Sequence, residues 1–197
     1  SHAEEVSRKY PTTIVAACAD INHSRDVQKL FSNDYFRVYS GNDVIGVEIG
    51  GAAKNIIALA AGICHGLGYG DNTMAALVTR GLEEIIRLGT TLGAERATFS
   101  GLSGMGDLIV TAFSPHSRNR QVGERIGKGE KLSDILAGME MVAEGVETAR
   151  SIHGLTQKNN IEMPICEQIY KVLFENISPR QAILELMGRE LVDEHPV

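Results

Sequence analysis

The chain has 197 residues, of which 43% are hydrophobic and 22% are charged, and its formal net charge is -6 at pH 7. This composition is typical of a globular protein and excludes a disordered or collagen-like chain. The length fits one domain, or one domain and part of another. Nucleic acid and anionic membrane surfaces bind clustered lysine and arginine, so neither is expected as a main partner.

The opening third of the chain has the pattern of the end of an α/β domain. Short apolar, β-branched and aromatic runs at Thr12–Cys18 and Phe36–Tyr39 predict two buried strands, and a short helix is expected from Ser24 between them. Val44–Ile49 is predicted as a further strand-like piece. The chain does not begin with Met and opens close to a strand, so we expect it to be part of a longer protein.

From Gly50-Gly51 onward the signals are almost entirely helical. Ala52–Leu67 predicts one long apolar helix, and residues 71–88 predict a second with apolar positions at helical spacing. The first stretch is long enough to raise the question of a membrane span, but the polar residues and glycines within it favour a buried core helix. Further helices are expected at Ser117–Ile126, Ser133–Ala137, Glu144–Gly154 and Pro164–Phe174, and after a cap at Ser178.

These elements predict a mainly α protein. Residues 1–47 are expected to be the remnant of an α/β domain, and residues 48–197 a helical domain. The three cysteines lack the spacing of a metal site, which favours free thiols in a reducing, cytoplasmic environment. The six histidines lack ligand spacing as well, and no G-x-S-x-G elbow indicates hydrolytic chemistry.

Lys54 is the first candidate for chemistry, because the residues around it, such as Ala53 and Ile57, are apolar. Removal from water disfavours the charged form of an ammonium group, so a lysine in such surroundings can exchange a proton with an alcohol or a carbonyl oxygen. Alternatively, its stem lies on the core while its amino group reaches water. Gly50-Gly51 favours the first interpretation, since two glycines at a helix start let a backbone or a ligand approach closely.

Three further polar groups stand at predicted helix starts. Asp107 follows the glycine-rich break Gly101–Gly106, which is no phosphate-binding P-loop because no Lys-Ser/Thr pair closes it. In the structural interpretation, Asp107 stands in the first turn of a helix, where the helix dipole favours a carboxylate. In the functional interpretation, it orients a polyol hydroxyl or pairs with Lys54. Ser117–Arg120 is either a solvated helix start or a site for a phosphate monoester. Glu144 is either a cap or a partner for ribose hydroxyls.

Four blocks occur in an order and at spacings that resemble the bacterial-type NAD(P)-dependent glycerol-3-phosphate dehydrogenases. They are Gly50–Ala58, Ser100–Leu108, Ser117–Arg120 and Ala143–Gly145. Ser1–Glu5 is similar to the tail of the family's Gly-Pro-Ser-x-Ala-x-Glu segment. The resemblance implies the all-helical substrate domain of a 6-phosphogluconate dehydrogenase-like architecture, preceded by the last strands and helix of an incomplete Rossmann-type NAD(P)-binding domain.

The resemblance also implies roles for individual residues. Lys54 would be the catalytic proton acceptor for the C2 hydroxyl of sn-glycerol 3-phosphate. The substrate contacts would be Ser1, Lys54, Asp107, Ser117, Arg118 and Asn119. The cofactor contacts would be Ala3, Arg118, Val142 and Glu144, and no metal is implied.

By the same resemblance, the complete protein is an enzyme that interconverts dihydroxyacetone phosphate and sn-glycerol 3-phosphate with NAD or NADP. It would supply glycerol 3-phosphate for glycerophospholipid synthesis. It would be a homodimer in the cytoplasm, with no nucleic acid or membrane partner. The chain by itself is expected to be inactive, because the G-x-G-x-x-G turn and the first units of a dinucleotide domain are absent from its sequence.

Two alternatives remain open from the residues. Other β-hydroxyacid dehydrogenases, including those like 6-phosphogluconate dehydrogenase, place a lysine and an asparagine on a comparable helix. They usually space the two further apart than Lys54 and Asn55, and they lack the Ser117–Arg120 sequence. In the second alternative the chain is a helical interaction module without catalysis, in which the Lys54 side chain merely reaches water.

Overall fold

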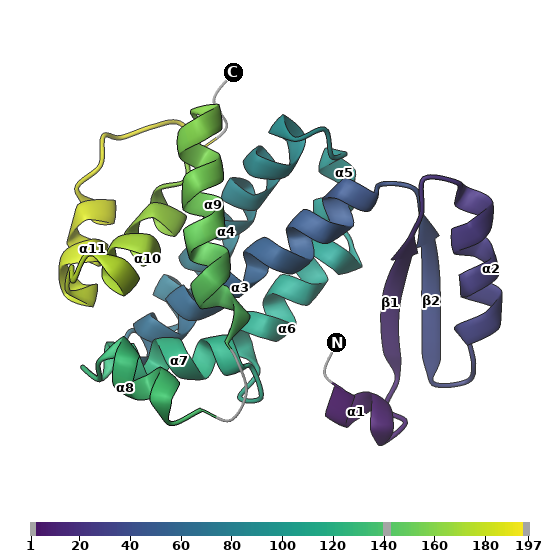
Figure 1. Cartoon of the computed structure of the whole chain (residues 1–197), viewed down its shortest axis with the longest axis horizontal. Helices are drawn as coiled ribbons and strands as arrows, with labels where there is room; N and C mark the ends of the chain where they lie inside the picture. Colours follow the sequence, from purple (N-terminus) through teal and green to yellow (C-terminus); the bar gives the residue numbers. More distant parts are fainter. Residues whose placement is uncertain (1–2, 140–142, 195–197) are drawn as a thin grey trace.

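The computed structural model describes residues 3–139 and 143–194, which form a small α/β unit beside a larger helical body (Figure 1). The mainly α fold that the sequence predicts is confirmed. In chain order the elements are α1 (Ala3–Ser7), β1 (Thr12–Ala17), α2 (Ile21–Phe31), β2 (Phe36–Gly41), α3 (Val44–Gly66), α4 (Asp71–Thr91), α5 (Arg96–Phe99), the π-helical segment η1 (Leu102–Gly106), α6 (Asp107–Phe113), α7 (Arg118–Gly127), α8 (Leu132–Ala137), α9 (Glu144–Asn159), α10 (Pro164–Phe174) and α11 (Pro179–Met187).

The α/β unit contains the two predicted strands. β1 and β2 pair in parallel, with Ile14 opposite Val38. α2 packs on this sheet (Figure 1), and its Gln28 side chain donates a hydrogen bond from Nε2 to the Val38 carbonyl at 2.8 Å. The helix begins earlier than the predicted Ser24 because Asp20 caps it, accepting a hydrogen bond from a backbone N–H of the first turn.

The predicted strand at Val44–Ile49 is wrong, because these residues form the first turns of α3. Asp43 determines this local structure. Its Oδ1 accepts a hydrogen bond from the Gly46 N–H at 2.8 Å, while Oδ2 accepts from the Thr98 hydroxyl at 2.6 Å and from the Glu95 N–H at 2.9 Å. Burial raises the pKa of Asp43, but these hydrogen bonds outweigh it and hold the pKa below its ordinary value. A cap with tertiary partners therefore overrides the β-branched pattern.

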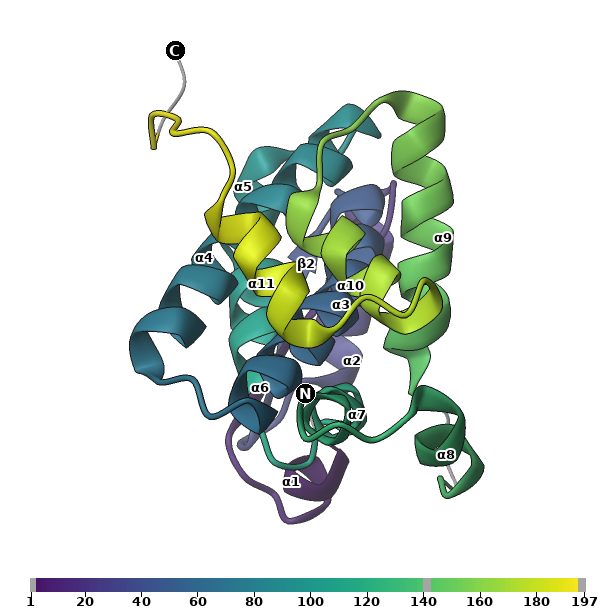
Figure 2. The ribbon, with the colours of Figure 1, turned by 90° about the vertical axis from the view of Figure 1, so that its left-hand side faces the viewer.

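α3 is the centre of the helical body. Other helices, among them α4, α7, α9 and α10, surround it (Figure 2), and the residues from Ile56 to Ala61 are almost completely buried. Within the described ranges it is the one helix long and apolar enough to cross a membrane. A helix that is apolar all round is also typical of a protein core, and the packing inside the body supports this interpretation. The predicted domain boundary between residues 47 and 48 falls inside α3 and stays a prediction.

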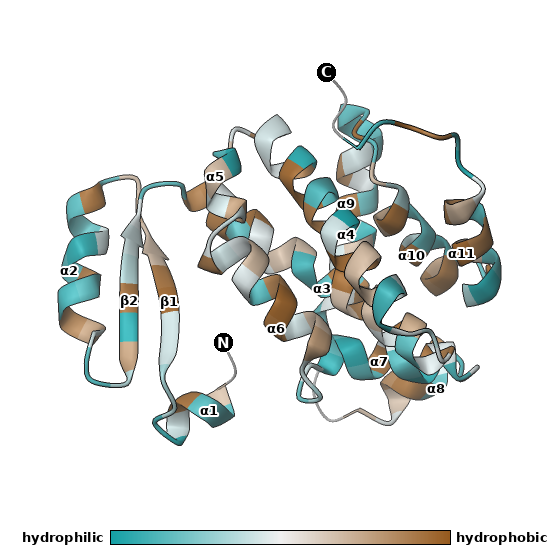
Figure 3. Ribbon diagram, turned by 180° about the vertical axis from the view of Figure 1, so that it is seen from behind, coloured by the Kyte–Doolittle hydropathy of each residue, from teal (hydrophilic) through white to brown (hydrophobic). Residues whose placement is uncertain are grey.

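The remaining helices largely follow their sequence signals. α11 begins after its predicted Ser178 cap, and α10 begins at the predicted Pro164. α4 begins at Asp71 after Gly70, without a side-chain cap, and α9 extends further than expected. α1 and α5 were not predicted, whereas the helix start expected at Asp107 is the start of α6. The glycine-rich break Gly101–Gly106 is wound as η1, which continues directly into α6. α6 carries some of the most hydrophobic residues seen in Figure 3, and Ile109 and Phe113 on it are 44% and 49% exposed.

Glu84 on α4 is a buried carboxylate, only 3% exposed, that joins α4 to α10. Its two oxygens accept hydrogen bonds from the backbone N–H groups of Ile165 at 2.7 Å and Cys166 at 3.1 Å. Both groups lie in the first turn of α10, where N–H groups have no partner within the helix. Burial raises the pKa of Glu84 to about 7, against the opposing effect of these hydrogen bonds.

The raised pKa makes stability depend on pH. Between pH 4.5 and about 7, the folded state holds a proton on Glu84 that the unfolded state has released. The stability that protonated Glu84 contributes is therefore complete below pH 4.5, and it is lost as the pH rises through about 7. In urea unfolding, the free energy of unfolding of the unmodified protein is expected to fall as the pH rises across this range. It is expected to fall less in Glu84→Gln, because glutamine cannot ionise. Glu83→Gln, at a half-exposed neighbour paired with Arg96, is the control. An identical pH dependence in Glu84→Gln and the unmodified protein contradicts the prediction.

Candidate functional site

A cavity of about 200 Å³ opens where α3, α6, α7 and the start of α9 meet. It gathers polar residues that are far apart in the sequence. Within the described part of the chain, no group of three His, Cys, Asp or Glu side chains is placed to hold a metal ion. The residues that line the cavity are Gly51, Lys54, Asn55, Asp107, Val110, Thr111, His116, Ser117, Arg118, Asn119 and Glu144.

Six of the nine residues predicted for the site line this cavity, and among the described residues Ala3 does not. Ala3 is exposed at the start of α1 and is not part of the lining. Ser1 and Val142 lie outside the described residues. The substrate contact predicted for Ser1 and the cofactor contacts predicted for Ala3 and Val142 stay predictions.

Lys54 and Asp107 form an ion pair between Nζ and Oδ2 in the wall of the cavity. The two residues are 53 positions apart in sequence, and their side chains are 18% and 21% exposed. The pairing of Asp107 with Lys54, one of the interpretations that the sequence left open, is therefore observed, and Lys54 is a partly exposed ammonium group beside a carboxylate. A charge-assisted hydrogen bond fixes the direction of the amino group, which suits a group that transfers a proton to a bound molecule.

A close approach of η1 to α3 brings this pair together. A Cβ atom at Gly50 would lie 2.6 Å from the Ser103 carbonyl oxygen, so the η1 backbone can reach this position only because residue 50 is glycine. η1 continues into α6, whose first residue is Asp107. The prediction that Gly50-Gly51 allows a backbone to approach is confirmed at Gly50, and Gly51 lines the cavity itself.

The start of α7 supplies hydrogen-bonding groups on the other side of the cavity. Ser117 is the N-cap of α7, and its Oγ accepts a hydrogen bond from the Arg120 N–H at 3.3 Å. Asn119 Oδ1 accepts a hydrogen bond from the Gly145 N–H at 2.9 Å, which fixes the orientation of the amide and leaves its NH2 group as the donor on the other side. A helix start with hydroxyl and amide donors is suited to a phosphate group.

Arg118 and Glu144 form a more exposed side of the cavity. Arg118 Nη2 lies 3.9 Å from Glu144 Oε1, and the side chains are 40% and 67% exposed. A guanidinium binds phosphate oxygens and a carboxylate accepts hydrogen bonds from ribose hydroxyls, so the two residues fit a nicotinamide dinucleotide. Glu144 also stands in the first turn of α9, where the helix dipole favours a carboxylate. Both interpretations of Glu144 therefore remain open.

Three further polar residues line the cavity, although the sequence did not single them out for the site: Asn55, Thr111 and His116. Asn55 is 7% exposed and directly follows Lys54, and this adjacency was the available signal. Thr111 stands one helical turn after Asp107, to whose carbonyl its hydroxyl donates at 2.6 Å. Its spacing of four residues from Asp107 was the available signal, because residues four apart on a helix lie on the same face.

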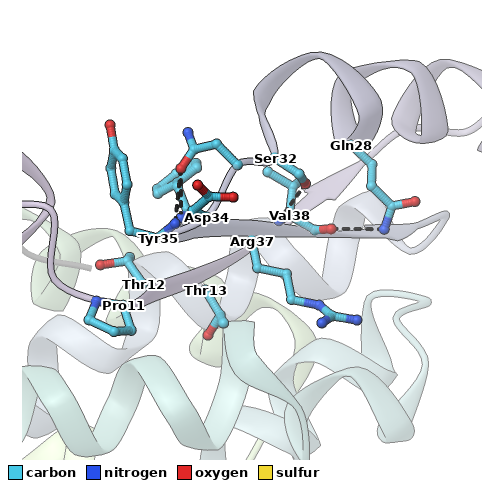
Figure 4. Close-up of a pocket in the computed structure, with 11 residues that line it drawn as sticks. Pro11, Thr12, Thr13, Gln28, Ser32, Asp34, Tyr35, Arg37 and Val38 are labelled. Atoms are coloured by element: carbon cyan, nitrogen blue, oxygen red, sulfur yellow. Dashed lines mark hydrogen bonds between the residues drawn. The ribbon is translucent and has the colours of Figure 1, made fainter.

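A larger hollow, of about 540 Å³, lies at the amino ends of β1 and β2 (Figure 4). Several of its polar groups already bind the backbone: Gln28 donates to the Val38 carbonyl, and the Ser32 hydroxyl accepts from the Val38 N–H at 3.1 Å. Ligands of open α/β sheets bind at the carboxyl ends of the strands instead. The cavity at Lys54 is therefore the stronger candidate site.

The chain is similar to known proteins of one family. Residues 43–184 match the family model described as NAD-dependent glycerol-3-phosphate dehydrogenase C-terminus. The curated glycerol-3-phosphate dehydrogenase (NAD(P)+) from Solidesulfovibrio magneticus is 55% identical over 98% of this chain, and the match covers 59% of that protein. The one from Exiguobacterium sp. is 58% identical over 96% of this chain, and the match covers 55% of that protein. The crystal structure of glycerol-3-phosphate dehydrogenase from Coxiella burnetii aligns with a TM-score of 0.92 at 39% identity, over 95% of this chain and 58% of that one.

The fold and these matches define the helical, C-terminal part of an NAD-dependent dehydrogenase. More particularly, the chain belongs to the NAD-dependent glycerol-3-phosphate dehydrogenase family, and it spans somewhat more than half the length of the curated relatives it matches. The resemblance seen in the four sequence blocks is thereby confirmed. It outweighs the alternatives of a 6-phosphogluconate dehydrogenase-like enzyme and of a helical interaction module.

The Asn119–Gly145 hydrogen bond predicts opposite outcomes for two substitutions. Asn119→Ala leaves the Gly145 N–H without its acceptor in buried surroundings, and the free energy of unfolding is expected to fall by about 1–3 kcal/mol. Asn119→Asp keeps an acceptor oxygen, and its free energy of unfolding is expected to stay within about 1 kcal/mol of the unmodified protein. Denaturant unfolding measures both, and equal losses in the two variants contradict the prediction.

Proposed function

We propose that the chain is the substrate-binding, C-terminal part of an NAD(P)-dependent sn-glycerol-3-phosphate dehydrogenase, which interconverts dihydroxyacetone phosphate and sn-glycerol 3-phosphate. One observation carries the proposal: the Lys54–Asp107 pair and the start of α7 share one small cavity. The pair offers a group for proton transfer, and the helix start offers donors for a phosphate. The names of the relatives support the same reaction.

In this proposal Lys54 is the catalytic residue. Its Nζ donates a proton to the C2 carbonyl oxygen of dihydroxyacetone phosphate during reduction, and accepts the C2 hydroxyl proton of sn-glycerol 3-phosphate during oxidation. NAD(H) or NADP(H), when bound, supplies or accepts the hydride at C2. Asp107 holds the Lys54 amino group in place and lies close enough to contact the substrate as well.

The phosphate of the substrate is proposed to bind at the start of α7. Ser117 and Asn119 are 4% and 8% exposed, so their donors sit in a largely desolvated position at the N-terminal end of a helix. Arg118 adds a guanidinium group beside them. Binding the phosphate away from C2 holds the reacting carbon near Lys54, and such positioning is one of the largest contributions to catalysis.

The dinucleotide is proposed to contact Arg118 and Glu144 on the exposed side of the cavity. Similarity to the family adds Ala3 and Val142 as cofactor contacts, and Ser1 as a substrate contact. No metal ion is required in this proposal.

For the complete protein, we propose the domain division and the cellular role that the resemblance implies. Residues 1–47 belong to the NAD(P)-binding α/β domain, and residues 48–197 form the helical substrate domain. The protein acts as a homodimer in the cytoplasm, without a nucleic acid or membrane partner. Its product supplies glycerol 3-phosphate for glycerophospholipid synthesis.

Lys54→Met tests the catalytic role in a complete enzyme that carries this chain. The kcat for reduction of dihydroxyacetone phosphate is expected to fall by about 100- to 10,000-fold, because methionine occupies similar space but cannot transfer a proton. Circular dichroism and thermal unfolding check that the variant is folded. Lys158→Met, at an exposed lysine near the end of α9, is the matched control and should keep normal kinetics. Normal kcat in Lys54→Met would show that the lysine is structural.

Residues 1–197 expressed alone are expected not to oxidise NADH in the presence of dihydroxyacetone phosphate. The relatives are much longer than this chain, and the glycine-rich turn that binds a dinucleotide is not in its sequence. The absorbance of NADH measures the rate directly. Turnover close to that of a complete enzyme would overturn this expectation.

A further inference from the structure

α3 and α7, which carry Lys54 and the proposed phosphate-binding residues, touch through four glycines. These are Gly62 and Gly66 on α3, and Gly123 and Gly127 on α7. A Cβ atom at any of the four positions would lie closer than 3.0 Å to a backbone atom of the other helix; at Gly127, for example, it would lie 2.5 Å from the Ile63 carbonyl oxygen. The spacing of four residues on both helices lets the two backbones come together.

This contact cannot adjust by side-chain rotation. The atoms that an added methyl group would meet are backbone atoms of α3 or α7, and backbone atoms inside a helix move only with the helix. Helices with ordinary side chains between them have axes about 8–10 Å apart. Any larger residue at these positions must therefore push α7 away from α3 or turn one against the other.

The glycine contact leads directly to the site. A Cβ atom at Gly123 would meet the Leu59 backbone, and one at Gly127 would meet the Ile63 backbone. Residue numbers therefore increase in the same direction along both helices, which run parallel. About one turn further toward their starts, this pairing brings Asn55 level with Asn119. Gly145 joins the same place, since a Cβ atom there would lie 2.8 Å from both the Asn55 carbonyl oxygen and Asn119 Oδ1.

We propose that the four glycines are positioning residues, which fix the distance between the Lys54 amino group and the phosphate-binding start of α7. The inference rests on the proposed function and extends it: the α3–α7 spacing selects substrates whose carbonyl and phosphate stand at one separation, as in a three-carbon phosphorylated ketone. Proton transfer needs the carbonyl oxygen within about 3 Å of Nζ while the phosphate is bound. A shift of α7 therefore slows the reaction without removing any group that touches the substrate.

Gly123→Ala in a complete enzyme tests this inference with two substrates. Dihydroxyacetone phosphate must span both helices, whereas dihydroxyacetone has the same carbonyl without the phosphate and needs only Lys54. The kcat/KM for dihydroxyacetone phosphate is expected to fall by about 10- to 100-fold. Dihydroxyacetone lacks the phosphate that positions C2, so the unmodified enzyme is expected to reduce it more slowly, and its kcat/KM is expected to change less than about twofold in the variant. Gly154→Ala is the matched control, because it lies in α9 and its added methyl group meets no described atom within 4 Å.

The outcomes separate the inference from the proposed function. If the unmodified enzyme does not reduce dihydroxyacetone phosphate, the proposed function fails. If it does, equal losses for the two substrates in Gly123→Ala, or no loss in a folded variant, overturn the positioning role alone. Should Gly123→Ala fail to fold, the same comparison is made with Gly127→Ala, at the end of the contact away from the site. A loss confined to the phosphorylated substrate supports the inference there as well.

Discussion

A lysine in the middle of an apolar core helix needs a countercharge, and in this chain Asp107 provides it. The contact between Lys54 Nζ and Asp107 Oδ2 joins α3 to α6, which are separated in the sequence by α4, α5 and η1. It depends on Gly50, where a side chain would collide with the Ser103 carbonyl oxygen and keep η1 away. Both side chains are partly exposed in the cavity. Lys54 is the one charged residue that α3 contributes to the lining of the cavity.

The opposite side of the cavity is made by two helix starts. α7 begins after its Ser117 cap, α9 begins at Glu144, and the hydrogen bond from the Gly145 N–H to Asn119 joins them. Helix starts direct unpaired N–H groups and positive dipole ends outward. An acidic chain can thereby bind an anionic substrate through one local site, although its net charge is negative.

Local signals predicted much of this structure. The Ser178 and Pro179 cap, the proline at the start of α10 and the helical spacing in α4 all correspond to observed elements. The strand predicted at Val44–Ile49 was wrong because Asp43 is held by Thr98 and Glu95, which are distant in sequence. The Lys54–Asp107 pair was only one of the interpretations that the sequence left open, because the two residues are 53 positions apart and no local pattern joins them. The glycines between α3 and α7 have one local signature, their spacing of four residues, but only packing shows what a side chain there would meet.

The most direct test of the central claim is a crystal structure of a complete enzyme carrying this chain, with dihydroxyacetone phosphate and the nicotinamide cofactor bound. The C2 carbonyl oxygen is predicted to lie within about 3 Å of Lys54 Nζ, with the phosphate on Ser117, Arg118 and Asn119 at the start of α7. A substrate bound with its phosphate away from α7, or with C2 out of reach of Lys54, would contradict it.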